Sequence, residues 1–251
     1  MKELQDETLI LIPSRYASTR FPGKPLVEIA GRPMVEHVYE KAAAVSPFVY
    51  VATDDARIRA AVEAFGGRAV MTSASHRSGT DRCAEAYGKV KEALGRDFKV
   101  VVNVQGDEPF IAPEQISALI ARFEEPEVEI ATLAKPFEKN EEIFDSNKVK
   151  VVLSARSTAL YFSRCPIPYC RGVEQDGWLA RAPYYKHVGM YAYRPEVLKA
   201  ITALPPGVLE QTESLEQLRW LENGYTIAVS ITHHESIGID TPEDLKKIKC
   251  L

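Results

Sequence analysis

The sequence predicts an α/β fold with a mostly parallel, Rossmann-like sheet flanked by helices. Two observations predict it. Short apolar runs alternate with amphipathic helical segments through the first half of the chain, and Gly, Pro or Asp residues separate them. The composition, 45% hydrophobic and 26% charged over 251 residues, is that of a globular protein with a sizeable core. We therefore expect residues 1–251 to form a single domain.

In the first half of the chain, predicted strands alternate with predicted helices. Strands are predicted at 9–12, 48–53, 68–71 and 98–104. Helices are predicted at 34–45, at 55–65 with Asp54 as its N-cap, from the polar segment 72–82 to about 95, and at 113–124. Pro113 suits the first turn of the last of these helices. Because ligands bind beyond the carboxyl ends of parallel strands, the loops after these strands should share one rim.

The pattern changes in the second half. Strands are predicted at 129–134, 148–153, 158–163 and 187–194, without regular helices between them. The segment 136–185 therefore reads as a mixed β insertion. Helices return at 195–203 and 213–222, and a last strand is predicted at 225–231. A final helix should begin after Thr241, which is placed as its cap, with Pro242 in the first position.

Charge and targeting signals exclude several classes. The formal net charge of −4 argues against a nucleic-acid binder that works by bulk charge. The polar segment 1–7 has no signal-peptide core, and no apolar run approaches a membrane span. The four cysteines form no C-x-x-C pair, so we expect reduced thiols in a cytoplasmic protein, with a Cys165–Cys170 disulfide disfavoured.

A basic loop follows the first strand. It carries Arg15, Arg20 and Lys24 and no acidic residue, and Ser14 adds a hydroxyl. Three cations at a strand end favour an anion such as a phosphate, although a solvated basic loop would contain the same residues. The spacing is neither that of a P-loop nor that of a dinucleotide fingerprint.

Two aspartates, Asp107 and Asp240, are candidate metal ligands. Asp107 comes just after the strand at 98–104 and directly after Gly106, and Asp240 lies in a short turn before the last helix. Mg²⁺ binds a few carboxylates together with phosphate oxygens, so the pair would suit a nucleoside triphosphate. Each aspartate could equally be a turn or cap residue. Among the histidines, His187 stands at the start of an apolar strand and is the one of interest, whereas His37 reads as structural.

Taken together, these segments resemble the 3-deoxy-manno-octulosonate cytidylyltransferases, a family of sugar nucleotidyltransferases. The resemblance runs along nearly the whole chain in order and spacing. Its motifs are IPSRYASTRFPGKPL at 12–26, ATDD at 52–55, HRSGTDR at 76–82, NVQGDEP at 103–109, ALYFSR at 159–164 with PIP at 166–168, KHVGMY at 186–191, LEQLR at 215–219 and GIDTPEDL at 238–245.

The resemblance implies a function and a set of site residues. The family moves CMP from CTP to the anomeric hydroxyl of 3-deoxy-manno-octulosonate (Kdo), with release of pyrophosphate, for lipopolysaccharide core synthesis. Arg15, Lys24, Asp107 and Asp240 would be catalytic, and the two aspartates would bind Mg²⁺. The expected nucleotide contacts are Ser14, Arg15, Arg20, Lys24, Ser78, Gly79, Asp81 and Arg82. The expected sugar contacts are Gln105, Arg164, His187, Tyr191, Glu216 and Gln217.

The resemblance also implies a sheet of the nucleotide-diphospho-sugar transferase type, with the insertion 136–185 used to form a homodimer. Other readings remain open. The acceptor could be sialic acid or an amino-substituted Kdo. A glycosyltransferase would leave the basic loop unexplained and usually carries a D-x-D motif, where this chain has Gly106-Asp107-Glu108. A nucleotide-sensing protein on the same scaffold is the non-enzymatic reading.

Overall fold

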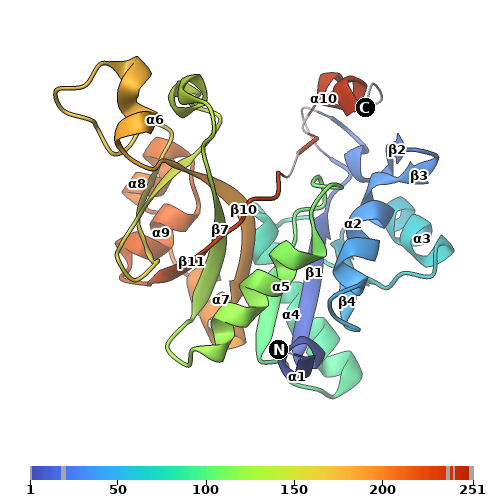
Figure 1. The fold of residues 1–251 in the computed structure, drawn as a ribbon. Helices are drawn as coiled ribbons and strands as arrows, with labels where there is room; N and C mark the ends of the chain where they lie inside the picture. Colours follow the sequence, from blue (N-terminus) through green and yellow to red (C-terminus); the bar gives the residue numbers. More distant parts are fainter. Residues whose placement is uncertain (1, 18–20, 236–237, 240, 249–251) are drawn as a thin grey trace.

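A single large sheet organises the molecule. The computed structural model describes residues 2–17, 21–235, 238–239 and 241–248. Within these residues the sheet has nine strands (Figure 1). The order across it is β11 (Ile227–Ile231), β7 (Ile130–Pro136), β10 (Tyr185–Tyr193), β6 (Val100–Asn103), β1 (Thr8–Ser14), β4 (Val49–Thr53) and β5 (Ala69–Met71). Only β10 runs antiparallel to its neighbours on this path, so the predicted mostly parallel sheet is confirmed.

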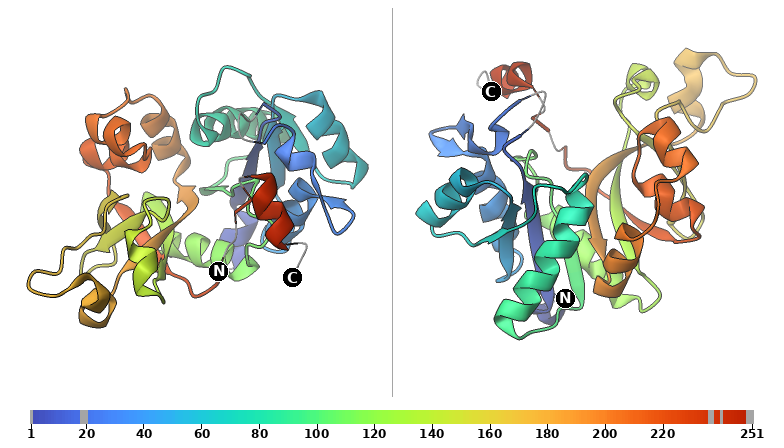
Figure 2. Two further views of the ribbon diagram at one scale, coloured as in Figure 1. Left: turned by 90° about the horizontal axis from the view of Figure 1, so that it is seen from above. Right: turned by 180° about the vertical axis from the view of Figure 1, so that it is seen from behind.

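Two hydrophobic layers enclose the sheet. Because side chains alternate along a strand, Ile10 and Ile12 of β1 face one layer, and Leu9 and Leu11 face the other. The first layer contains α2 (Met34–Ala43), α3 (Ala56–Ala64) and α5 (Pro113–Ala121), and the second contains α4 (Gly79–Leu94) and α7 (Pro195–Thr202). The views from front and behind show α5 and α4 on opposite faces (Figure 2). Helices therefore cover both faces, as predicted.

The structure corrects one predicted helix cap and gives the start of a second helix. The cap of α3 is Asp55, whose carboxylate accepts a hydrogen bond from the backbone N–H of Arg57 at 2.8 Å. Asp54 instead forms an ion pair with Arg82. The helix predicted to run from the polar segment 72–82 is α4, which begins at Gly79 inside that segment, because Ser78 and Asp81 form a capping box there.

The helix expected at 213–222 is also different. It is divided into α8 (Val208–Glu213) and α9 (Gln217–Glu222). Ser214 stands at the break with a left-handed backbone, φ +53°. Residues before a left-handed position end a helix, and propensity alone gave no reason to expect one at a serine. The break leaves Leu215 and Glu216 outside both helices, beside the open end of the sheet.

The segment 136–185 has the mixed β character that was predicted. β8 (Lys150–Leu153) and β9 (Ala159–Ser163) form an antiparallel hairpin, and β8 also pairs with the start of β10. The short helix α6 (Trp178–Arg181) and two 3₁₀ turns complete it. A separate small core of Phe137, Ile143, Cys170, Trp178 and Tyr184 supports this segment. Cys165 and Cys170 are both free thiols, as expected.

The remaining elements are short or terminal. α1 (Lys2–Asp6) and the hairpin of β2 (Glu28–Ile29) and β3 (Arg32–Pro33) were not predicted. The last helix, α10 (Pro242–Ile248), begins after Thr241, whose hydroxyl accepts from the N–H of Asp244, so the predicted cap is confirmed. Figure 1 shows α10 above the half of the sheet that contains β1. Within the described part of the chain, no helix is long and apolar enough to cross a membrane.

Candidate active site

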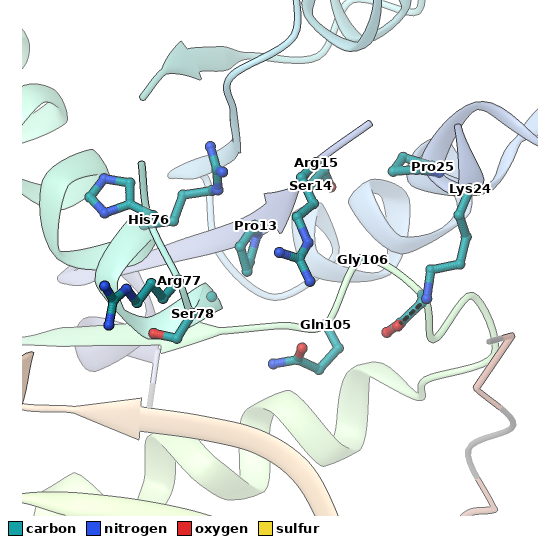
Figure 3. A pocket seen from close by; sticks show the side chains of 13 residues that line it. Pro13, Ser14, Arg15, Lys24, Pro25, His76, Arg77, Ser78, Gln105 and Gly106 are labelled. Atoms are coloured by element: carbon teal, nitrogen blue, oxygen red, sulfur yellow. Dashed lines mark hydrogen bonds and ion pairs between the residues drawn. The ribbon is translucent and has the colours of Figure 1, made fainter. Parts of the chain in front are cut away.

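The carboxyl ends of β1 and β6 open into a cavity of about 310 Å³, here called the strand-end cavity (Figure 3). The loop after β1, the loop after β6 and the start of α4 line it. This arrangement is the one expected for a ligand site on a parallel sheet. The lining residues are Pro13, Ser14, Arg15, Lys24, Pro25, His76, Arg77, Ser78, Gly79, Arg82, Gln105, Gly106 and Asp107.

Gly106 allows the two strand-end loops to approach each other. A Cβ atom at this position would lie 2.8 Å from the Oγ of Ser14 and 3.2 Å from the carbonyl oxygen of Pro13. Ser14 is itself buried, so it has little room to move away. The glycine therefore lets Asp107 stand next to the loop that begins at Arg15.

Lys24 and Asp107 meet across this cavity. The Lys24 ammonium lies 2.6 Å from an Oδ atom of Asp107, and the dashed line in Figure 3 marks this ion pair. Arg15 is exposed and also lines the cavity. The base of the loop is closed by a hydrogen bond from the N–H of Gly23 to the carbonyl of Tyr16, at 2.9 Å. Arg20, the third predicted cation, lies outside the described residues.

The start of α4 brings further cations to the cavity. Arg82 is almost fully buried and donates to the hydroxyl of Thr72 at 2.5 Å, and the Asp54 carboxylate lies 3.2 Å from the same guanidinium. His76 and Arg77, which sequence reasoning had not placed in a site, also line it. Asp81 does not, because its carboxylate caps α4 by accepting from the N–H of Ser78. The cavity is thus rich in cations, with Asp107 as its carboxylate.

A second cavity of about 270 Å³, here called the β10 cavity, adjoins the first. Gly79 and Gln105 line both. Every predicted sugar contact except Arg164 is found here. The lining residues are Gly79, Thr80, Asn103, Gln105, His187, Gly189, Tyr191, Leu215, Glu216 and Gln217. Residues more than a hundred positions apart in sequence are therefore brought to one polar cavity.

Burial shifts the pKa values of the ionisable side chains that line the β10 cavity. It lowers the pKa of His187 to about 3, so the ring is neutral at physiological pH, and Nε2 lies 3.0 Å from the hydroxyl of Thr132. Burial also raises the pKa of Glu216, against the effect of a 2.6 Å hydrogen bond donated by Thr80. The phenol of Tyr191 has its pKa raised, chiefly by burial as well. These side chains supply hydrogen-bond donors and acceptors of the kind that hydroxyl groups bind.

Arg164 lies apart from both cavities. Its guanidinium donates to three main-chain carbonyls, those of Glu213 at 2.7 Å, Ser146 at 3.1 Å and Ser214 at 3.3 Å. Two of these residues precede Leu215 and Glu216, which line the β10 cavity. In this structure Arg164 thus supports the segment that contains Glu216.

The residues around Asp107 suit a hard divalent cation in part. Asp107 supplies carboxylate oxygens beside an open cavity, which is the chemistry that Mg²⁺ prefers. The other predicted ligand, Asp240, lies outside the described residues, and within the described ranges no group of three His, Cys, Asp or Glu side chains could hold a metal. The N–H of Ile239 donates to the carbonyl of Asp107 at 2.9 Å, so the chain just before Asp240 contacts the Asp107 loop.

Comparison with known proteins agrees with this geometry. The cytidylyltransferase family model matches residues 9–237. The chain is 57% identical over 240 residues to the 3-deoxy-manno-octulosonate cytidylyltransferase of Phocaeicola vulgatus, covering 94% of each protein. It is 58% identical to the protein of that name from Bacteroides thetaiotaomicron, again covering 94% of each.

Solved structures give the same result. The structure of CMP:2-keto-3-deoxy-manno-octonic acid synthetase complexed with CTP superposes with a TM-score of 0.88, at 43% identity and with 97% of both chains covered. A cytidylyltransferase from Leptospira borgpetersenii shares the fold, with a TM-score of 0.60 at 15% identity, over 97% of this chain and 85% of that one. The chain therefore belongs to the 3-deoxy-manno-octulosonate cytidylyltransferase family.

Proposed function

We propose that this protein transfers CMP from CTP to the anomeric hydroxyl of Kdo, giving CMP-Kdo and pyrophosphate. The observation that carries the proposal is the meeting of two different cavities at Gly79 and Gln105. The cationic strand-end cavity suits a triphosphate, and the polar β10 cavity suits a sugar. A reaction that joins these two substrates needs them side by side.

The nucleotide half of the proposal assigns roles to the basic residues. Arg15, Lys24 and Arg20 would neutralise the triphosphate, and Ser78, Gly79 and Arg82 would contact the nucleotide at the start of α4. The protein has little covalent work in such a transfer, because the acceptor hydroxyl attacks the α-phosphorus in line and pyrophosphate leaves. Its task is to hold both substrates and to balance their charge.

We further propose that Asp107 and Asp240 bind Mg²⁺. The support is the carboxylate of Asp107 beside the cavity and the hydrogen bond from Ile239 to its carbonyl. Bound there, Mg²⁺ would polarise the α-phosphate and lower the pKa of the attacking hydroxyl. Lys24, which pairs with Asp107 in the structure, would then be released toward the phosphates.

The second half of the proposal concerns the sugar, and it places Kdo in the β10 cavity. Gln105, His187, Tyr191, Glu216 and Gln217 would read its hydroxyls. The Nε2 atom of the neutral His187 ring is held by the Thr132 hydroxyl, so Nδ1 is left to hydrogen-bond a sugar hydroxyl without adding charge. Arg164, whose guanidinium is bound to main-chain carbonyls, is proposed to act here through the segment it supports rather than through the predicted contact with the sugar carboxylate.

We also propose a homodimer formed through the insertion 136–185. The insertion exposes Leu160 and Tyr169, which are 60% and 74% accessible. Apolar side chains of this size at a surface favour association. Light scattering of the protein, compared with a Leu160→Lys, Tyr169→Lys variant, tests this proposal, since the variant should be monomeric.

Pyrophosphate release tests the proposed reaction. The protein should release pyrophosphate from CTP with Kdo and Mg²⁺, and not from CTP alone or without Mg²⁺. Sialic acid and an amino-substituted Kdo, used in place of Kdo, separate the acceptor classes. Faster release with either of them would reassign the sugar, and no release with any acceptor would refute the transferase.

A further inference from the structure

A pair of lysines on neighbouring strands holds a glutamate of the C-terminal segment. Lys135 of β7 and Lys186 of β10 are direct cross-strand partners. Both ammonium groups contact Glu235, Lys135 at 2.9 Å and Lys186 at a still shorter distance. Like charges placed opposite each other across a sheet are destabilising, and a shared carboxylate offsets this.

The two lysines are far less accessible than ordinary surface lysines. The side chain of Lys135 is 9% exposed and that of Lys186 is 19% exposed. Burial acts to raise the pKa of Glu235, but hydrogen bonds from Lys186 and Lys135 outweigh it and lower the pKa. Glu235 is therefore an anion shared by two sheltered cations.

Glu235 lies in the chain between the end of β11 and Ile239. β11 ends its pairing with β7 at Thr232, whose N–H donates to the carbonyl of Ala134 at 2.9 Å. A few residues later, Ile239 is fully buried beside Ile29 and Met34, in the other half of the molecule. Its N–H donates to the carbonyl of Asp107. Figure 1 shows β11 on one side of the sheet and α10 above the other half, which contains β1.

We propose that Glu235 is a positioning residue, which holds residues 232–235 against β7 and β10 so that Ile239 keeps its contact with Asp107. Glu235 contacts one half of the molecule, and Ile239 contacts the other. The consequence for metal binding rests on the proposed function, because Asp240 follows Ile239 in the sequence. The contact itself does not rest on that function.

Glu138 provides a matched control. Its carboxylate lies 2.6 Å from the same Lys135 ammonium, but it belongs to the loop after β7 rather than to the C-terminal segment. Glu138→Gln and Glu235→Gln each remove one carboxylate from Lys135. Only Glu235→Gln should release residues 232–235 and weaken the contact of Ile239 with Asp107.

Hydrogen–deuterium exchange of the protein without substrates tests the proposal. The peptide containing the Ile239 N–H should exchange at least fivefold faster in Glu235→Gln, and within twofold of the natural protein in Glu138→Gln. The Mg²⁺ concentration that gives half-maximal pyrophosphate release should rise several-fold in Glu235→Gln alone, with the KM for CTP nearly unchanged at saturating Mg²⁺.

Two results would overturn the proposal. Equal exchange at Ile239 in the natural protein and in Glu235→Gln would show that the glutamate does not hold the segment. Equal effects of the two variants would show that only the charge balance of Lys135 matters. A protein that shows the exchange difference but never releases pyrophosphate would refute the proposed function and leave the role of Glu235 intact.

Discussion

The Lys24 ammonium and the Asp107 carboxylate form a 2.6 Å ion pair although they are 83 positions apart in the chain. One follows β1 and the other follows β6, which are parallel neighbours in the sheet. Sheet topology therefore joins the basic loop to the candidate metal ligand. In the proposed reaction, Lys24 would exchange Asp107 for phosphate oxygens, and Asp107 would exchange Lys24 for Mg²⁺.

Asp107→Asn tests the carboxylate. The amide keeps the size of the side chain but cannot balance a cation, so kcat should fall well over tenfold. The Lys24–Asp107 pair is partly exposed, so its loss should cost at most about 1 kcal/mol of folding stability. Steady-state kinetics and a thermal melt measure the two effects. Asp97→Asn, which breaks an exposed pair with Lys91, is the control, and near-normal turnover in Asp107→Asn would remove Asp107 from the site.

Gly106→Ala tests the close approach of the two loops. The added methyl would lie 2.8 Å from the Oγ of Ser14, so the loop that contains Asp107 must shift. We expect kcat to fall at least tenfold, with a stability loss of about 1–3 kcal/mol from overpacking. Gly88→Ala in α4 has open space around its Cβ and should gain about 0.5–1 kcal/mol. Unchanged kcat in Gly106→Ala would contradict the proposed geometry.

His187 should remain neutral through the physiological range. Burial lowers its pKa in the folded protein to about 3, while the unfolded chain takes up a proton near 6.5. The unfolded state therefore binds more protons between these values, and His187 should cost stability as the pH falls from about 6.5 towards 3.

His187→Gln should remove that cost, about 1.4 kcal/mol per pH unit below about 6.5. Urea unfolding at pH 7 and pH 5 compares the two proteins, and NMR titration of the ring should give an apparent pKa below 4. An inflection near 6.5 for this ring would show that it is solvated and charged at mildly acidic pH.

Arg164→Lys tests the guanidinium. Lysine cannot span the three carbonyls of Glu213, Ser146 and Ser214, so we expect a loss of about 1–3 kcal/mol in stability. Because Ser214 leads into Leu215 and Glu216, the KM for Kdo should rise more than the KM for CTP. Equal changes in both KM values would argue that Arg164 does not serve the sugar side.

Parts of the candidate site could be predicted from the sequence because a general rule connects residues that are distant in the chain. The rule that ligands bind at the carboxyl ends of parallel strands predicts that the loop of Arg15 and Lys24 lies beside Asp107. Motif resemblance then added Glu216 and placed it in one set with His187, which is otherwise singled out only by its position at the start of a strand. The strong alternation of apolar runs with helical segments allowed the fold itself to be predicted from the sequence.

Other features depended on tertiary packing and were missed. Ser214 breaks the helix because the chain turns there with a left-handed backbone, which serine propensity does not indicate. The N-cap of α3 is Asp55 and not Asp54, a difference of one residue. Asp54 forms an ion pair with Arg82 instead. Thr80 and Asn103 line the β10 cavity, and only their positions in the quoted motifs could have drawn attention to them.

Metal binding in the presence of CTP tests the central proposal most directly. Mn²⁺ can replace Mg²⁺ as a spectroscopic probe, and its free concentration is measured by electron paramagnetic resonance. With CTP present, the natural protein should bind Mn²⁺ at least tenfold more tightly than either Asp107→Asn or Asp240→Asn, whereas Asp97→Asn should match the natural protein. Equal Mn²⁺ affinity in all four proteins would contradict a metal site built from Asp107 and Asp240.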